Sequence, residues 1–481
     1  MIALQQIYLS LNWSPIYWQT AVLTVNSGSK TAEEDGDKEK RDYGKTAKAI
    51  ANLREQNITI ATPLINSSYT DFSPDEENNR ILFALKGIRS MNDEAVAKIL
   101  NNRPYTSVED FFERVAPRND SQVRELTDNY FKVQGIKVKK TSEEYVKKAS
   151  EFKETEKRLE KGQVIALIKS GAFKEFNEDS MTTMQKWVKY TTQLKTSLNG
   201  QNLSSAIRLG IFDTEDREEL KLVYEMRSVI KKDKVKDTNG TSKDLVRTRS
   251  SQYKSLLTKL FSPSVVVDTV GEYSIIDINQ FEKEYEKFKE QTDAILKQPE
   301  TLQQFNIALF IENWNKVASG TPESWEMETI VFYSEKHELD YLDYGVYNVT
   351  PLNEIPKEPL VESTYMYRGV ERANYKIFTI VGTVVDKNKD KGHFTMITPE
   401  GVITCKTYKG AFSHYDKQIK RDGKIVDKSW FTRGNRLMVW GYIKDDMFIL
   451  KAPKNVHTIA RIDSLDRDTG RAYLSLERES N

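Results

Sequence analysis

Five short runs of alternating apolar and polar residues between Tyr375 and Leu450 constrain the fold more than any other feature of the sequence. β-Branched and aromatic residues dominate these runs, and Gly, Asp and Asn separate them, which is typical of strands joined by turns. A short helix is expected at about residues 409–420, between the third and fourth runs. Five strands with one helix after the third is the order of an OB-fold barrel, which we predict for residues 371–455. The predicted strands are Ile377–Val385, Phe394–Thr398, Val402–Tyr408, Leu437–Ile443 and Met447–Leu450.

Ahead of the predicted barrel, apolar residues recur with the 3.6-residue period of helices. A bulky apolar segment ends near residue 26, and another helix is expected near residues 46–56. Residues 178–330 are rich in Lys, Glu and Gln, and the polar stretch Ile230–Arg249 is expected to be a mobile loop. The sequence therefore predicts a multidomain α+β protein whose N-terminal two thirds are mainly helical. The predicted parts are residues 1–79, 80–177, 178–370, 371–455 and 456–481, the last of them a tail.

The charge balance restricts how this chain could contact nucleic acid. Lys and Arg together number 72 and Asp and Glu 71, for a net charge of +1. Any contact with DNA must therefore come from local basic patches. The single cysteine, Cys405, excludes an internal disulfide, and the four histidines show no metal-ligand spacing. No apolar run reaches the roughly 18 residues of a membrane span, so we expect a protein of the bacterial host cytoplasm that contacts no membrane.

Two stretches near the N-terminus resemble the fingers of the bacterial DNA polymerase III alpha subunit, a C-family polymerase, in a form similar to a bacteriophage relative. The stretches are WSPIYWQTAVLTVNS (13–27) and LREQNITIATPLINSSYTDF (53–72). Pro63, Asn66 and Phe72 stand where the family pattern has them. The resemblance implies that residues 1–79 are the C-terminal part of the polymerase fingers.

Further stretches resemble later parts of the same family, in the family's order. ILFALKGIRSMNDEAVAKILNNRPYTSVEDFFERV (81–115) and KGQVIALIKSGAF (161–173) resemble the two halves of a tandem helix-hairpin-helix region. WEMETIVFYSEKHEL (325–339) resembles the connector ahead of the OB-fold. The resemblance implies that residues 80–177 grip duplex DNA behind the active site and that the barrel lies near the incoming template strand.

The hairpin turn at residues 89–92 is the first candidate DNA contact. A helix-hairpin-helix places backbone N–H groups and a helix N-terminus against a phosphate, which requires a tight turn. Ser90-Met91-Asn92 stand where the family has Gly-hydrophobic-Gly; Asn92 can adopt a left-handed conformation and Ser90 is small. Two interpretations stay open, a phosphate contact and a purely structural hairpin. The candidate residues are Arg89, Ser90, Met91 and Asn92.

The second candidate DNA contact is a mixture of lysines and aromatic residues on the predicted barrel. OB-folds bind single strands with a basic groove and aromatic side chains on the second and third strands and the flanking loops. Phe412, Tyr415 and Trp430 are expected to pack inside the barrel. The candidate residues are Lys387, Lys389, Lys391, His393, Phe394, Lys406, Tyr408 and Lys409.

No acidic cluster in the sequence has the pattern of a polymerase active site. The family transfers nucleotides with palm aspartates that hold two Mg²⁺ ions about 3.5–4 Å apart. The acidic candidates lie in a charge run, after a helix-like segment or in a strand turn, so we expect this chain to bind no cofactor and to have no catalytic residue. The acidic candidates are Asp35, Asp37, Asp340, Asp343, Asp445 and Asp446.

The family order implies that Met1 falls inside the fingers, so a second polypeptide is expected to supply the PHP, palm, thumb and early fingers and to hold the Mg²⁺. The sequence thus favours the C-terminal subunit of a split DNA polymerase, inactive by itself, acting on primer-template DNA. The alternative is a non-enzymatic replication accessory that binds DNA with the same modules. A sliding clamp is a further candidate partner, because Gln304–Phe310 loosely resembles a clamp-binding peptide. Packing of an amphipathic helix is the competing interpretation of that segment.

Overall fold

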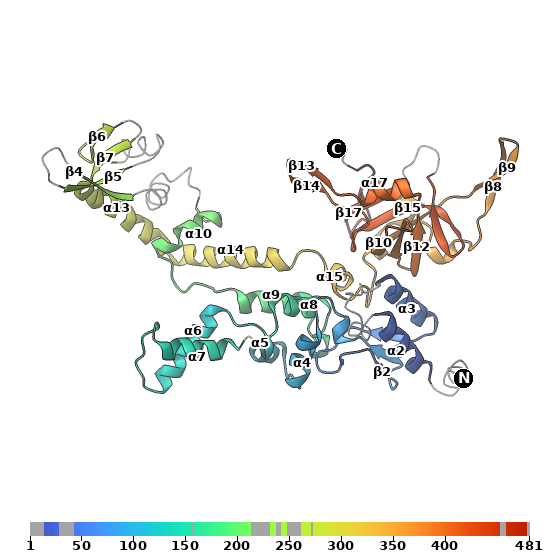
Figure 1. Cartoon of the computed structure of the whole chain (residues 1–481), viewed down its shortest axis with the longest axis horizontal. Coiled ribbons are helices and arrows are strands. Elements are labelled where there is room, and N and C mark those ends of the chain that lie inside the picture. The colour runs from blue at the N-terminus through green and yellow to red at the C-terminus, as the bar shows by residue number, and fades with distance from the viewer. Residues whose placement is uncertain are drawn as a thin grey trace. The chain divides into compact units, whose positions relative to one another are not determined.

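The computed structural model describes residues 14–27, 43–154, 157–212, 231–236, 242–247, 261–270, 273–452 and 458–478 (Figure 1). The chain forms two compact units. The first unit combines Met1–Met184 with Gly320–Asn481, and the second is Gln185–Ser319. None of the helices in the described part of the chain combines the length and apolar character needed to cross a bilayer.

The described part of the first unit opens with two helices and a small sheet. Helix α2 (Pro15–Asn26) starts with a proline at its first position, where the missing N–H costs no hydrogen bond. It packs against α3 (Tyr43–Glu55). Strand β3 (Arg80–Leu82) pairs in parallel with β1 (Thr59–Ala61) and antiparallel with β2 (Ser73–Asp75).

Short helices joined by tight turns form the region predicted to be helix-hairpin-helix. They are η1 (Leu85–Gly87), α4 (Asp93–Asn101), α5 (Val108–Val115), α6 (Asp120–Val133), α7 (Glu143–Lys153), α8 (Lys161–Lys169) and η3 (Lys174–Phe176), and α9 (Ser180–Thr191) follows this region. The two sequence halves share one core, because the Phe111 ring of α5 lies 5.0 Å from that of Phe173, just after α8. Both rings are buried.

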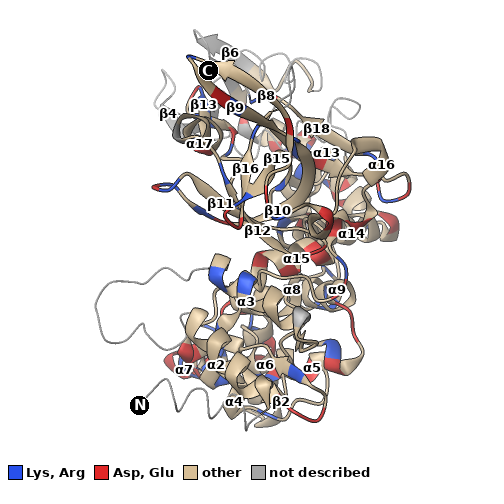
Figure 2. Cartoon of the chain, turned by 90° about the vertical axis from the view of Figure 1, so that its right-hand side faces the viewer, with Lys and Arg blue, Asp and Glu red and all other residues tan. Residues whose placement is uncertain are grey.

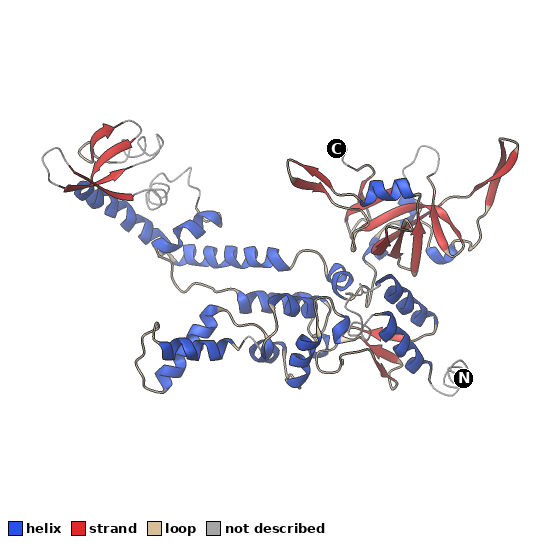
Figure 3. Ribbon diagram, in the orientation of Figure 1, coloured by secondary structure: helices blue, strands red, loops and turns tan. Residues whose placement is uncertain are grey.

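The predicted barrel is present as a closed five-stranded sheet, coloured red in Figure 3. Its strands are β10 (Phe378–Asn388), β11 (His393–Ile397), β12 (Val402–Lys406), β15 (Arg436–Lys444) and β16 (Met447–Leu450). Neighbours pair in the order β10-β11-β12-β16-β15, and β15 pairs back to β10. Only the β12–β16 pair is parallel. Helix α17 (Lys409–Asp416) follows the third strand, as the sequence predicts.

Apolar side chains from alternate positions of every strand fill the barrel. Phe412 and Trp430 lie in this core and Tyr415 packs against it, which confirms the prediction for these residues. Gly441 permits a close approach of two strands, since a Cβ there would lie 2.2 Å from the Ile449 carbonyl oxygen. The close approach of β15 and β16 therefore depends on the absence of a side chain at Gly441.

Further strands and short helices surround the barrel. Strands β17 (Ile459–Leu465) and β18 (Ala472–Ser475) extend its sheet beyond β15, although the sequence analysis expected only a tail there. Two separate hairpins are β8 (Val361–Tyr367) with β9 (Val370–Tyr375), and β13 (Ile419–Arg421) with β14 (Lys424–Asp427). The connector contains α15 (Pro322–Thr329), η5 (Glu338–Tyr341), α16 (Tyr344–Tyr347) and η6 (Leu352–Glu354).

The second unit joins helices to a four-stranded sheet. Its helices are η4 (Gly200–Asn202), α10 (Leu203–Arg208), α13 (Ile278–Leu296) and α14 (Pro299–Val317), together with the end of α9. The sheet order is β4 (Lys231–Lys236), β5 (Ser242–Arg247), β7 (Tyr273–Asp277) and β6 (Val266–Val270).

The prediction of a loop at Ile230–Arg249 is wrong, because β4 and β5 pair along their whole length. Both strands are too rich in Lys and Asp to show an apolar alternation, and pairing of β5 with β7 supplies the context that the sequence lacks. The Asn239-Gly240 pair between the two strands in the sequence is a hairpin signal that was available.

Candidate nucleic-acid interface

The turn between η1 and α4 is as tight as the hairpin requires, but the residue that makes it so is not the one expected. Ser90 has a φ of +68°, whereas Asn92 is extended. Asn92 instead caps α4, its Oδ1 accepting a hydrogen bond of 2.9 Å from the Ala95 N–H. The left-handed conformation therefore belongs to Ser90, and the expectation for Asn92 is corrected. An N-cap needs a non-helical backbone and a short polar side chain, which Asn92 supplies.

The other two candidates of this turn point in different directions. Met91 is buried, so its side chain serves the core. Arg89 is about half exposed, and its guanidinium lies 3.6 Å from the Glu328 carboxylate of α15. The Arg89 N–H also donates to the Thr329 carbonyl, at 2.9 Å. These contacts hold the turn against the connector and leave part of the Arg89 side chain open to solvent.

Carboxylates at the start of α4 influence how an anion would be bound there. Asp93 and Glu94 occupy its first turn and are paired with Lys86 and Lys98, both at 2.7 Å. A phosphate at this helix N-terminus would have to share the lysines with these carboxylates. A phosphate contact and a structural hairpin are therefore both compatible with the turn.

The segment that resembles polymerase fingers is fastened to the hairpin region. The Asn66 side chain donates to the Tyr105 carbonyl at 2.9 Å and accepts from the Tyr105 N–H at 2.8 Å. Arg103 donates to the Ile65 carbonyl at 2.7 Å. Asn66 thus joins the segment after β1 to the connection between α4 and α5.

A cluster of cations lies at one edge of the barrel. His393 of β11 stands opposite Lys406 of β12 in the strand register. Partial burial, followed by the nearby ammonium groups of Lys406, Lys391 and Lys48, lowers the pKa of His393 below its usual value. Lys391 and Lys406 are exposed. We call Lys48, Lys391, His393 and Lys406 the basic edge.

Lys48 was not among the candidates, because it belongs to α3, far from the barrel in sequence. Figure 2 shows α3 below the barrel, where it contacts β10 and β12. Ala47 packs in one cluster with Val385 and Ile397 of the barrel, and the Arg433 guanidinium lies 3.5 Å from the centre of the Tyr43 ring. No local sequence signal could have shown this contact, since it arises only from tertiary packing.

The remaining lysine candidates differ in whether their ammonium groups are paired within the protein or exposed to solvent. Lys387 is paired with Asp416 of α17 and hydrogen-bonded to Ser429 at 3.3 Å, so its ammonium group stabilises the barrel itself. Lys389 is exposed in the turn between β10 and β11. The Lys409 side chain lies outside the described part of the structure.

One of the two aromatic candidates is buried and the other is exposed. Phe394 is 1% exposed and stacks on Phe431 inside the barrel, with ring centres 4.4 Å apart. Its ring is not a surface for stacking bases, contrary to the prediction, because position 394 faces inward in the alternation of β11. Tyr408 is 83% exposed, at the start of α17. Tyr408 therefore remains available for contact.

Each described acidic candidate has a structural role. Asp340 accepts a hydrogen bond of 2.8 Å from the His337 N–H, and Asp343 caps α16. Asp445 and Asp446 form the tight turn between β15 and β16. Asp35 and Asp37 lie outside the described residues. Within the described ranges, no three His, Cys, Asp or Glu side chains are grouped as metal ligands would be.

A buried hydrogen-bond network fixes the connector to the barrel. The Glu338 carboxylate accepts from the Tyr333 hydroxyl at 2.7 Å and from the Thr383 hydroxyl at 2.9 Å. Arg436 of β15 lies 3.6 Å away. Since a buried carboxylate is costly without partners, these contacts orient the connector on β10 and β15.

Comparison with known proteins matches one motif model and several DNA polymerases. A family model described as "Helix-hairpin-helix motif" matches residues 57–129, which include the Ser90 turn. The chain is 34% identical, over 97% of its length, to "Probable DNA polymerase YorL" of Bacillus subtilis (strain 168) and to a "DNA-directed DNA polymerase" of Bacillus phage SPbeta. Its relatives are DNA polymerases. The resemblance to polymerases inferred from the motifs is thereby confirmed.

A shorter match extends the comparison. Over 119 residues, 24% of this chain and 8% of the relative, the chain is 30% identical to "DNA polymerase III subunit alpha" of Deinococcus radiodurans. The chain spans about a third of the Bacillus subtilis and SPbeta relatives, since each match covers 34% of their length. Most of each relative therefore has no counterpart in this sequence.

Proposed function

We propose that this chain is the DNA-holding subunit of a split C-family replicative DNA polymerase, and that it corresponds to late fingers, helix-hairpin-helix region and OB-fold. The similarity to DNA polymerases along 97% of the chain carries the proposal. The strand order of the barrel and the helix after its third strand support an OB-fold.

The two candidate contacts suit different parts of a primer-template. The helix-hairpin-helix region binds the sugar-phosphate backbone of the duplex, independently of base sequence. The basic edge of the barrel binds the unpaired template strand. Its cations neutralise phosphates, and the exposed Tyr408 ring offers a surface on which a base can stack. Both contacts weaken as salt rises.

The described residues do not suit a pair of magnesium ions, because their acidic candidates cap helices or form turns. In this proposal, a second polypeptide holds the palm aspartates and their Mg²⁺, together with the PHP, thumb and early fingers. This chain alone then positions DNA without transferring nucleotides.

Reconstitution tests the proposal. Primer extension is expected only when this chain is mixed with a polypeptide that carries the palm aspartates, and no extension is expected if those aspartates are changed to Asn. Extension by this chain alone would contradict the split. Tight DNA binding with no extension in the mixture would favour the accessory role.

Charge variants test the DNA contact separately. K391A/K406A should reduce the slope of log affinity against log salt for single-stranded DNA by about 1.4, since each of the two phosphate contacts contributes roughly 0.7. K424A, which removes an exposed charge from β14, serves as the matched control. An unchanged slope in K391A/K406A would remove the basic edge from the interface.

A further inference from the structure

The β8–β9 hairpin exposes several large apolar and aromatic side chains. It extends from the barrel (Figure 1), and among the described strands β8 and β9 pair only with each other. All seven residues of β8 are exposed, Met366 to 68%, Tyr367 to 45% and Tyr365 to 43%. Isolated two-stranded hairpins gain little stability in water, and exposed aromatic side chains mark surfaces that meet a partner.

The two faces of this hairpin differ in chemistry. The register places Tyr365 opposite Arg372 and Tyr367 opposite Val370, so these residues share one face. The other face carries Met366 opposite Glu371 and Thr364 opposite Ala373. Tyrosine and arginine therefore gather on one face while the carboxylate of Glu371 lies on the other.

Two arginine side chains lie over the ring of Tyr367. The Arg372 guanidinium lies 4.8 Å from the centre of the Tyr367 ring, and that of Arg368 lies 5.3 Å from it. Arg368 and Gly369 both have positive φ, as the tightest hairpin turns require. This turn fixes Arg368 beside Tyr367. We call Tyr365, Tyr367, Arg368 and Arg372 the tyrosine–arginine face.

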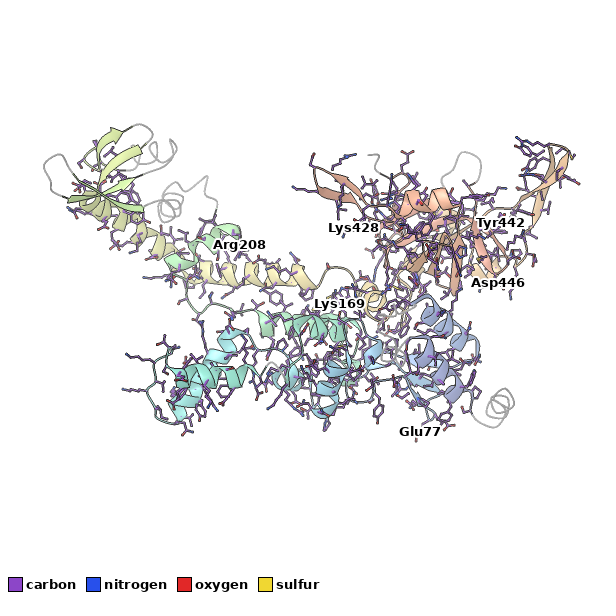
Figure 4. All side chains as sticks on the ribbon, in the orientation of Figure 1. Glu77, Lys169, Arg208, Lys428, Tyr442 and Asp446 are labelled. Carbon is purple, nitrogen blue, oxygen red and sulfur yellow. The ribbon has the colours of Figure 1, made fainter. Side chains whose placement is uncertain are left out.

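The base of the hairpin reaches the barrel through aromatic contacts. The Tyr375 ring at the end of β9 lies 4.8 Å from that of Tyr442 in β15, which is labelled in Figure 4. Burial, and then the Tyr375 and Tyr408 phenols, raise the pKa of Tyr442, so Tyr408 lies close to the same group. Aromatic side chains thus link the base of the hairpin to the barrel surface, with Tyr375 and Tyr442 half-buried and Tyr408 exposed.

We propose that the tyrosine–arginine face binds single-stranded DNA, an inference that rests on the proposed function and extends its template path beyond the barrel. Unpaired bases stack on Tyr365 and Tyr367, and Arg368 and Arg372 contact the phosphates. Positive charge without a carboxylate on this face suits a polyanion, and flat aromatic rings suit bases that are free to stack. Duplex DNA would satisfy the arginines but would keep its bases away from the rings.

The test measures binding of the full chain to an oligothymidine of about 20 nucleotides, longer than the site of one OB-fold, and to a blunt duplex. Y365A/Y367A should weaken oligothymidine binding about tenfold or more and leave duplex binding unchanged. Y365F/Y367F should bind as the wild type does, because stacking needs the ring and not the hydroxyl. T364A/M366A, on the opposite face of the same strand, is the matched control.

The possible results distinguish failure of the hairpin inference from failure of the proposed function. If the wild type binds both DNAs and Y365A/Y367A binds oligothymidine equally well, the hairpin inference is overturned and the proposed function stands. An equal loss in T364A/M366A also overturns it, since the effect would then not belong to one face. Loss of self-association with unchanged DNA affinity would assign the hairpin to a second copy of the chain. A wild type that binds neither DNA would instead refute the proposed function.

Discussion

Ser90 and Asn92 show how two polar residues can make a turn that glycine usually makes. Ser90 adopts the left-handed backbone, and Asn92 ends the turn by capping α4. A residue with a Cβ pays roughly 1–2 kcal/mol for this conformation relative to a right-handed one. The turn is therefore held by its surroundings, including the hydrogen bond from the Arg89 N–H to Thr329.

Substitutions of Ser90 should separate conformation from side-chain chemistry. S90V should lower the free energy of unfolding by about 1–3 kcal/mol, because a β-branched residue is strained at positive φ. S90G should be neutral or slightly stabilising, since glycine adopts this conformation freely. Urea unfolding of both variants is the measurement. Equal stability of S90V and S90G would contradict the left-handed turn.

The basic edge is assembled from four elements, and each contributes one side chain. The β10–β11 turn, β11, β12 and α3 converge there, which brings Lys48 to the cations of the barrel. Partial burial, and then repulsion from the three lysines, disfavours protonation of His393 and lowers its pKa. A bound phosphate reverses this balance, so proton uptake should accompany DNA binding at this element.

This linkage gives DNA binding a pH dependence with a definite sign. The pKa of His393 is lowered in the free protein and rises when a phosphate is bound, so affinity should increase as the pH falls from about 8 to about 6. H393Q should lose this increase. H414Q, which alters a histidine of α17, should keep it. A wild-type affinity that is independent of pH would exclude His393 from the interface.

Elements with a strong local pattern could be predicted, and contacts between elements could not. All five barrel strands and α17 were found to within a few residues, because alternation and turn residues are local properties. The same alternation could have placed Phe394 inside, yet its position beside His393 suggested the surface. Lys48 and the Tyr375–Tyr442 contact depend on packing between distant segments, which a single sequence does not reveal.

At the scale of the whole molecule, each unit has a hydrophobic core of its own. Phe305 of α14 is buried with Leu296 and Leu203 in the second unit. The segment Gln304–Phe310 therefore uses its first aromatic ring for helix packing, and a clamp partner remains a prediction. The β4–β7 sheet of this unit was missed because its strands lack an apolar period, and β17 and β18 were missed because they follow the expected end of the barrel.

Separate cores predict separate unfolding. F305A should destabilise the second unit by about 3–5 kcal/mol, the usual cost of removing a buried phenylalanine ring. Hydrogen exchange should quicken in α10, α13 and α14 and stay unchanged in β10, β11 and β12. Binding of single-stranded DNA should also be unchanged. Faster exchange in the barrel strands would show that the two units unfold together.

The packing of α3 against the barrel limits how this protein could be taken apart or recombined. Tyr43 and Ala47 complete a cluster whose other members include Val385 and Ile397. A barrel excised at residue 371 would expose that apolar surface to water and would tend to aggregate. Transferring the barrel to another protein would therefore require the first turns of α3 as well. The smallest transferable part then consists of two segments that are more than three hundred residues apart in the sequence.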